Sequence, residues 1–146
     1  SQYDVFALVR LTTGTCAMAV EAKVNETFGP TIAEWLVDAS PKKSARLEYL
    51  SVLLGLRPEP KLRYQLFHRT AAAILEARRF GMAEAAIVVQ SFSPDHRWFA
   101  DFAAFVAAFG RKDEVKPGIA VRHRLPDGMP LTLGWATCNL PAAMSA

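Results

Sequence analysis

The sequence predicts a single α/β domain, residues 1–146, in which a mixed sheet is flanked by helices. Two extended runs fold back on each other within residues 3–24. A nearly continuous apolar run at residues 84–91 is typical of a strand that is covered on both faces. Stretches with helical periodicity, bounded by Gly and Pro, lie between and after these runs. With 146 residues and 51% hydrophobic content, the chain has enough apolar material for one core.

The first predicted element is a β-hairpin with Thr13-Gly14 as its two-residue loop. This loop places Lys23 opposite Asp4 and Glu21 opposite Phe6. Because side chains on a strand alternate between faces, the charged groups of Asp4, Glu21 and Lys23 then converge on one face. The other face is expected to join the core through Val5, Ala7, Val9, Cys16, Met18 and Val20.

Helical periodicity and end signals predict helices at residues 31–39, 42–54, 61–80 and 93–109. Thr31 and Glu34 have the spacing of a capping box at the start of the first. Ser40 is expected to cap the second helix, with Pro41 at its first position. These signals favour two short helices before the long one.

The last helix is expected to begin at a cap formed by Ser93 or Asp95. Two further strands are expected at residues 119–125 and 131–138, around the turn Pro126-Asp127-Gly128. The basic run inside the first of these strands is interpreted as solvent-facing. The complete predicted order is therefore β-β-α-α-α-β-α-β-β.

The longest predicted helix carries an unusual polar stripe. Gln65, Arg69 and Glu76 share one face, since residues three or four apart are neighbours on a helix. Polar side chains need partners if they are buried, so we expect this helix to pack against the sheet face that carries Glu21, with Gln65 near the hairpin. The alternative is a stripe that meets solvent. His68, taken alone, is more typical of a helix histidine with a structural role.

The charged face of the hairpin suggests metal chemistry. Two nearby carboxylates, here Asp4 and Glu21, form the hard-oxygen environment that Mg²⁺ prefers, and waters and phosphate complete it. An adjacent lysine such as Lys23 can stabilise charge on a transferring phosphate or help to activate a water. The simpler alternative is an ordinary hairpin with a surface salt bridge.

The pattern of Asp4 followed by Glu21-Ala22-Lys23 resembles the PD-(D/E)XK phosphodiesterase superfamily, which has the restriction-endonuclease-like fold. Tyr3 stands where many members have Pro. Gln65 is similar in position to a Gln that the following helix often presents to the active site, but Arg69 stands where a Tyr is expected four residues later. The resemblance implies that the superfamily's first helix and first strand precede Ser1, and that residues 31–54 are an insertion.

This resemblance also implies a function, a Mg²⁺- or Mn²⁺-dependent nuclease. The metal ligands would be Asp4, Glu21 and the carbonyl of Ala22, while Lys23 would position or activate the attacking water. Gln65, and less directly His68 or Arg69, would orient Lys23 or a substrate phosphate. The implied catalytic residues are thus Lys23, Gln65, His68 and Arg69.

The whole chain also resembles an uncharacterised bacterial protein family of unknown function. The recurring patterns are similar to Ser1-Gln2-Tyr3-Asp4, Glu21-Ala22-Lys23-Val24, Phe28-Gly29-Pro30-Thr31, Arg63-Tyr64-Gln65-Leu66-Phe67-His68-Arg69-Thr70 and Gln90-Ser91-Phe92-Ser93. That second resemblance implies no activity. It does place the candidate polar elements in one protein.

Composition and charge limit the partners and the cellular location that we expect. A net charge of +3 and a pI near 9.1 are compatible with nucleic acid as a partner but do not require it. No apolar run approaches the roughly 20 residues needed to cross a bilayer. Cys16 and Cys138 lie in apolar surroundings and indicate free thiols in a reducing compartment, so we expect a cytoplasmic protein. A homodimer is the other association that we consider.

Two alternatives to the nuclease remain open at this point. One is a non-catalytic member of the fold that binds nucleic acid or a protein. The other is an enzyme of different chemistry, in which the stripe with His68 and Arg69 acts on a small anionic substrate.

Overall fold

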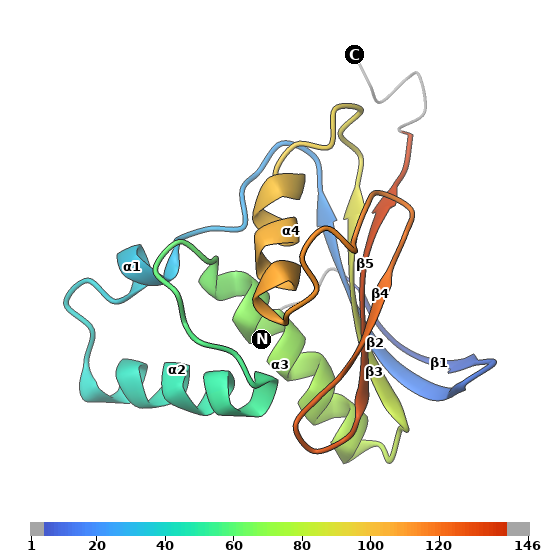
Figure 1. The fold of residues 1–146 in the computed structure, drawn as a ribbon, viewed down its shortest axis with the longest axis horizontal. Coiled ribbons are helices and arrows are strands. Elements are labelled where there is room, and N and C mark those ends of the chain that lie inside the picture. Colours follow the sequence, from blue (N-terminus) through green and yellow to red (C-terminus); the bar gives the residue numbers. More distant parts are fainter. Residues whose placement is uncertain (1–4, 140–146) are drawn as a thin grey trace.

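The computed structural model describes residues 5–139 (Figure 1). Nine elements occur there in the predicted order. They are β1 (Val5–Leu11), β2 (Gly14–Lys23), α1 (Ile32–Trp35), α2 (Pro41–Leu54), α3 (Tyr64–Arg79), β3 (Glu84–Ser91), α4 (Phe99–Ala108), β4 (Val121–Arg124) and β5 (Pro130–Thr137). Within residues 5–139, every helix is too short or too polar to span a bilayer.

The five strands form one mixed sheet in the order β1-β2-β3-β5-β4. Strands β2, β3 and β5 are parallel to one another, whereas β1 pairs antiparallel with β2 and β4 antiparallel with β5. The crossover from β2 to β3 contains α1, α2 and α3, and α3 packs on both strands. The described helices lie on one side of the sheet, with α3 and α4 next to it and α2 outside α3 (Figure 1).

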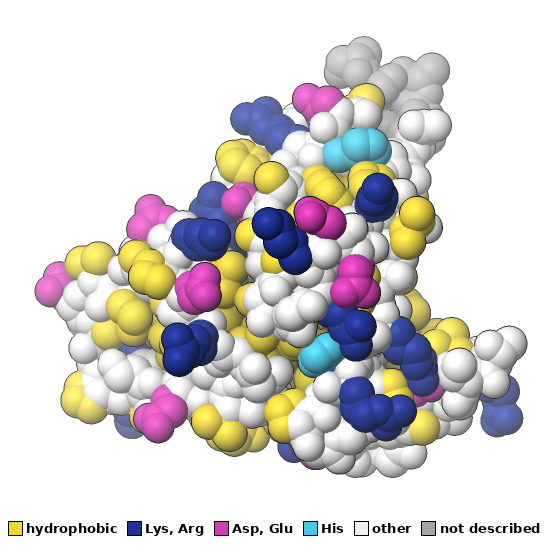
Figure 2. Space-filling view, viewed as in Figure 1, with side chains coloured by type: hydrophobic (Ala, Val, Ile, Leu, Met, Phe, Trp, Pro, Cys, Tyr) yellow, Lys and Arg dark blue, Asp and Glu magenta, His cyan; other side chains and the backbone are white. Residues whose placement is uncertain are grey.

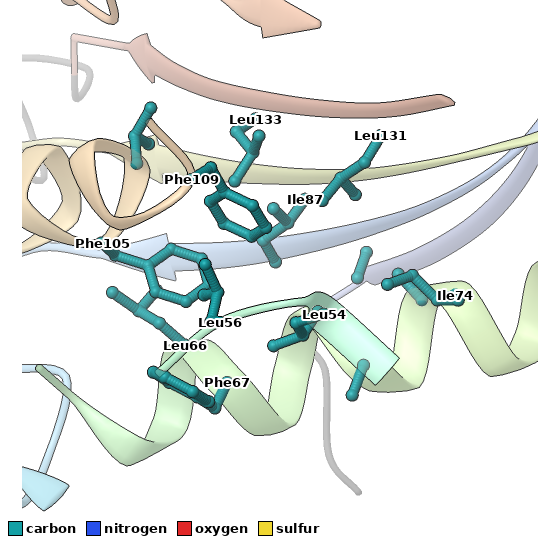
Figure 3. Close-up of a cluster of buried hydrophobic side chains, with 14 of the residues drawn as sticks. Leu54, Leu56, Leu66, Phe67, Ile74, Ile87, Phe105, Phe109, Leu131 and Leu133 are labelled. Atoms are coloured by element: carbon teal, nitrogen blue, oxygen red, sulfur yellow. The ribbon is translucent and has the colours of Figure 1, made fainter. Parts of the chain in front are cut away.

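The core lies between this layer of helices and the sheet (Figure 3). Ile87 from β3 and Leu133 from β5 meet Phe67 of α3 and Phe105 of α4, and each of these side chains is fully buried. The rings of Phe67 and Phe105 pack edge to face, with centroids 5.6 Å apart. The core therefore depends on one face of the sheet.

The prediction of which hairpin face joins the core is wrong, although Cys16, one of the residues predicted there, is fully buried. The core face of β2 carries Ala17 and Ala19, and it continues toward Glu21 and Lys23. Val5, on the opposite face, is 51% exposed, because the described helices cover only one side of the sheet. The charged residues are tolerated on the covered face because α3 brings polar partners to them.

The predicted register is also wrong, because Leu11 pairs with Gly14 and the loop is Thr12-Thr13. Gly14 has a φ of +143°, a conformation that L side chains rarely adopt, and it occupies the first paired position after the loop. Phe6 consequently pairs with Ala19 rather than with Glu21. A shift of partners by two residues leaves the alternation of faces unchanged.

Asp4, which the predicted register places opposite Lys23, lies outside the described residues. The register that placed it opposite Lys23 is the one that the structure corrects, so this pairing has lost its basis.

The predicted helix starts are partly confirmed. Thr31 and Glu34 form a capping box, with the Glu34 amide donating to Thr31 Oγ1 at 3.2 Å and the Thr31 amide donating to Glu34 Oε1 at 2.9 Å. Ser40 caps α2 and Gly55 ends it in the left-handed conformation. Helix α3 begins at Tyr64 rather than at position 61.

Helix α4 begins later than predicted. The segment before it is a turn in which Ser93 Oγ accepts a hydrogen bond from the Arg97 amide at 3.1 Å. His96 and Trp98 have positive φ values of 54° and 71°, which a continuous right-handed helix does not allow. The helix therefore extends only from Phe99 to Ala108.

Candidate functional site: a buried charged cluster on β2 and α3

Glu21 and Lys23 lie at the carboxyl end of β2, on the face that α3 covers. Only 5% of Glu21 and 4% of Lys23 is exposed. Their charged groups contact each other, with 3.3 Å between Lys23 Nζ and Glu21 Oε1. The alternation of a strand places both side chains on the same face, as predicted, and the packing of α3 buries them.

Helix α3 contributes two further polar groups, one turn apart. Arg69 Nε donates to Glu21 Oε2 at 3.0 Å, and Lys23 Nζ donates to Gln65 Oε1 at 3.2 Å. The predictions that α3 packs on the face carrying Glu21 and that Gln65 lies near the hairpin are therefore confirmed. We refer to Glu21, Lys23, Gln65 and Arg69 as the Glu21 cluster.

Lys23 is held more tightly than the sequence suggests. Besides Glu21 and Gln65, its ammonium contacts the carbonyl oxygen of Thr27 at 3.1 Å. Two of the three N–H donors of the ammonium thus have hydrogen-bond acceptors, and the Glu21 carboxylate balances its charge as an ion pair. The Phe28 ring lies beneath it, with 5.2 Å between Nζ and the ring centroid. The lysine thus has one fixed position in the structure.

The Glu21 cluster contains two cations and one carboxylate, and each carboxylate oxygen of Glu21 contacts one cation. Residues 5–139 contain no group of three or more His, Cys, Asp or Glu side chains arranged to hold a metal ion. Mg²⁺ is usually bound by one or two carboxylates that are free to coordinate it. The described residues by themselves therefore do not fit a divalent cation. Ala22, the third implied ligand, lies opposite Gln90 in the paired part of β2.

The loop that follows Lys23 is tied to two helices by residues that the sequence did not single out for this role. Arg63 Nη1 donates to the carbonyl of Gly29 at 2.7 Å, and its guanidinium also pairs with Asp101 at 3.2 Å. The indole N–H of Trp98 donates to the carbonyl of Asn25 at 2.9 Å. These bonds connect distant segments, so no local sequence pattern could have revealed them.

His68 lies on a different side of α3 from the Glu21 cluster. Its ring stacks on Tyr64, with 6.0 Å between centroids, and it lines a pocket with Arg46 of α2. Burial lowers the pKa of His68, and the positive charges of Arg69 and Arg46 lower it further. The geometry thus separates His68 from Gln65 and Arg69, with which the sequence grouped it.

A second buried carboxylate, Glu84, lies at the start of β3. Arg122 of β4 donates to both of its oxygens, at 2.7 and 2.9 Å. This bidentate contact holds the pKa of Glu84 below its ordinary value. Sequence reasoning interpreted Arg122 as solvent-facing and missed the pair, which we call the Glu84 pair. The Arg122 side chain is indeed 44% exposed, whereas the Glu84 side chain is only 2% exposed.

The surface charge is mixed. Figure 2 shows Lys and Arg side chains scattered among Asp and Glu over the visible face. The net charge of +3 is therefore not gathered into one basic field on that face.

A family model for a domain of unknown function, DUF6946, matches residues 1–140. The chain belongs to the DUF6946 family. This agrees with the expectation of an uncharacterised family, and it supplies no activity by which to interpret the Glu21 cluster. Among curated proteins and solved structures, the comparisons found no match. Any functional argument for this DUF6946 protein therefore depends on its own residues.

Proposed function

We propose that this protein hydrolyses phosphodiester bonds of nucleic acid as a Mg²⁺-dependent nuclease of PD-(D/E)XK type. The observation that carries the proposal is the contact of Lys23 with both Glu21 and Gln65 at the carboxyl end of β2. The resemblance implies this combination of an acid, a lysine and a helix-borne glutamine. The connection from a hairpin through a crossover helix to a parallel strand is a further point in its support.

In this proposal the chain's own residues have distinct tasks. Lys23 stabilises the negative charge that develops on the phosphate, and Gln65 and the Thr27 carbonyl hold its ammonium in place. Arg69 orients the Glu21 carboxylate through Oε2. Use of Lys23 at a phosphate requires that its ammonium turn from its present partners, Glu21, Gln65 and the Thr27 carbonyl, toward the phosphate.

Metal dependence rests on Asp4, which lies outside the described residues. Glu21 is the one carboxylate in the cluster, so the proposal needs Asp4 as the second, together with the carbonyl of Ala22. When bound, Mg²⁺ would supply Lewis acidity at the scissile phosphate.

A second candidate is a non-catalytic module of the same fold that binds nucleic acid or a protein. The observation in its favour is that each Glu21 oxygen already contacts a cation of the protein, and that Lys23 already has one ion pair and two hydrogen-bond acceptors within it. A cluster whose groups satisfy one another can serve mainly to fix the position of α3 on the sheet.

The two candidates are separated by metal binding and by cleavage. In a nuclease, Mg²⁺ or Mn²⁺ raises the melting temperature, because a ligand that binds only the native state stabilises it. Asp4→Asn should abolish this shift. Lys23→Ala should keep the shift and reduce cleavage of single- or double-stranded DNA or RNA about 100-fold or more.

Lys112→Ala is the matched control, because Lys112 is an exposed lysine outside the Glu21 cluster. It should change neither the metal shift nor the cleavage rate. If metal does not change the melting temperature and none of the four nucleic-acid substrates is cleaved, the nuclease proposal is contradicted and the binding module is favoured.

A further inference from the structure

A basic pocket lies where the starts of α2 and α3 meet the end of α1. Its volume is about 330 Å³, and it is lined by Trp35, Lys42, Lys43, Arg46, Tyr64 and His68. Among the described residues that line it, none is acidic, so an anion would be attracted into it. The positive end of the 14-residue helix α2 adds to this potential.

The aromatic rings of this pocket are already stacked on one another. Trp35 and Tyr64 lie nearly parallel, with 3.9 Å between centroids, and His68 also stacks on Tyr64, with 6.0 Å between centroids. Lys43 Nζ lies 4.7 Å from the Trp35 ring centroid. Because these faces are occupied, the pocket suits a compact oxyanion better than a flat ring that would need a free aromatic face.

A second pocket of about 350 Å³ adjoins the first, since both are lined by Arg46 and His68. It lies between α2 and α3, and its further lining includes Tyr49, Leu75 and Glu76. Tyr49 is 54% exposed and Leu75 is 37% exposed. A flat, largely apolar group could pack against these two side chains, and the Glu76 carboxylate could accept a hydrogen bond from its N–H edge. Glu76 also lies 3.9 Å from Arg79, so its charge is only weakly paired.

The two pockets together define a ligand with an oxyanion at one end and a flat ring at the other. Each volume is near the lower end of the roughly 300–1,000 Å³ that is typical of ligand pockets. From this juxtaposition we infer that the groove between α2 and α3 binds a nucleoside phosphate, with its phosphate at Lys42, Lys43 and Arg46 and its base against Tyr49 and Leu75. The groove is separate from the Glu21 cluster and goes beyond the proposed nuclease activity.

A free mononucleotide and the end of a single strand offer the same chemistry, so binding should be measured for both. The probes are the four ribonucleoside 5′-monophosphates, adenosine, inorganic phosphate and a short 5′-phosphorylated single-stranded oligonucleotide, all by isothermal titration calorimetry. A monophosphate should bind at least about tenfold more tightly than adenosine or phosphate, because each of these fills only one pocket. Binding of the oligonucleotide alone identifies a strand end as the source.

Variants at exposed positions test each half of the groove. Arg46→Ala should weaken binding of the monophosphate or oligonucleotide about tenfold or more, since it removes a charge-assisted contact. Tyr49→Ala should weaken binding of the nucleotide without affecting inorganic phosphate. Arg10→Ala, at an exposed arginine on β1, is the matched control, and its dissociation constant should stay within about twofold of that of the protein without substitutions.

Lys23→Ala should change the dissociation constant for the nucleotide by less than about twofold, because the groove is separate from the Glu21 cluster. This variant therefore separates failure of this inference from failure of the proposed nuclease. The inference is overturned if neither a monophosphate nor the oligonucleotide binds at millimolar concentration. It is equally overturned if phosphate binds as tightly as the nucleotides, or if Arg10→Ala weakens binding as much as Arg46→Ala does.

Discussion

Glu21 and Glu84 are buried carboxylates on neighbouring parallel strands, but they lie at opposite ends and on opposite faces of the sheet. Glu84 meets one arginine through a bidentate contact, which balances one negative charge with one positive charge. Glu21 meets two cations, Lys23 and Arg69, and a neutral amide completes the cluster. The Glu84 pair is balanced, whereas the Glu21 cluster has an excess of positive charge.

The cation of the Glu84 pair is also more exposed to solvent than the two cations of the Glu21 cluster. Arg122 keeps 44% of its side chain exposed, so water already solvates it. The side chains of Lys23 and Arg69 are only 5% and 14% exposed. Loss of the carboxylate should therefore have a larger effect on the Glu21 cluster, where two cations would stay buried without an anion. The comparison shows that the partners of a buried carboxylate decide its role. Glu84 forms one balanced ion pair between two strands, whereas Glu21 holds two cations together in a buried polar cluster.

The largest expected effect is that of Glu21→Gln. This change leaves Lys23 and Arg69 without their anion and should lower the free energy of unfolding by about 3–5 kcal/mol, measured by urea denaturation. Glu48→Gln, at an exposed position of α2, is the control and should change it by less than about 0.5 kcal/mol. The sequence predicted a second carboxylate beside Glu21 and therefore little cost for this change, but the two cations that contact Glu21 reverse that expectation. An unchanged or raised stability of Glu21→Gln would contradict the importance of the two ion pairs.

An intermediate effect is expected for Glu84→Gln. It should lower the free energy of unfolding by about 1–3 kcal/mol, because Arg122 can turn to solvent. The pKa of Glu84 lies below its ordinary value of 4.5 in the folded protein, mainly because of the hydrogen bonds from Arg122. A lowered folded-state pKa stabilises the protein above the unfolded pKa, and this contribution is lost as the pH falls through the folded value. Denaturation between about pH 6 and 2 should show a shallower acid loss in Glu84→Gln. Equal slopes in both proteins would contradict this.

The smallest effect concerns Cys16, which lies opposite Glu84 in the sheet and is fully buried. Burial, and to a smaller extent the negative charge of Glu84, raise the pKa of the Cys16 thiol to about 11, while the positive charge of Arg122 acts in the opposite direction. Glu84→Gln should therefore lower this pKa, by about one unit or less. The NMR chemical shift of the Cys16 β-carbon follows the titration. The same midpoint in Glu84→Gln and in the unchanged protein would show that the Glu84 charge does not reach the thiol.

The regular elements were largely predictable because their signals are local. The capping box at Thr31, the cap at Ser40 with Pro41 after it, and the continuous apolar run of β3 each lie within a few neighbouring residues. The start of α4 was mispredicted because it depends on the positive φ values of His96 and Trp98. One of these residues donates its indole N–H to a loop more than 70 positions earlier, as the contact of Trp98 with Asn25 shows. Such a contact is not visible to a local pattern.

The candidate site was predictable in part. The two-residue period of a strand placed Glu21 and Lys23 on one face, and the helical period placed Gln65 and Arg69 on one stripe. Their need for partners then led correctly to the packing of α3 on that face. The hairpin register was not predictable, because Thr13-Gly14 and Thr12-Thr13 are both plausible two-residue loops and the difference depends on the conformation of Gly14.

By itself, therefore, the sequence determined the order of the elements, the mixed α/β class and the residues that could share a face, because these follow from periods of two and of 3.6 residues. Only the tertiary structure decided which hairpin face is buried, since that depends on the side on which the crossover helix packs. The same packing decided that Arg69 contacts Glu21, whereas His68 lines a pocket together with Arg46. The side chains of neighbouring residues on one helix point in different directions, so their partners come from different segments that are distant in the chain.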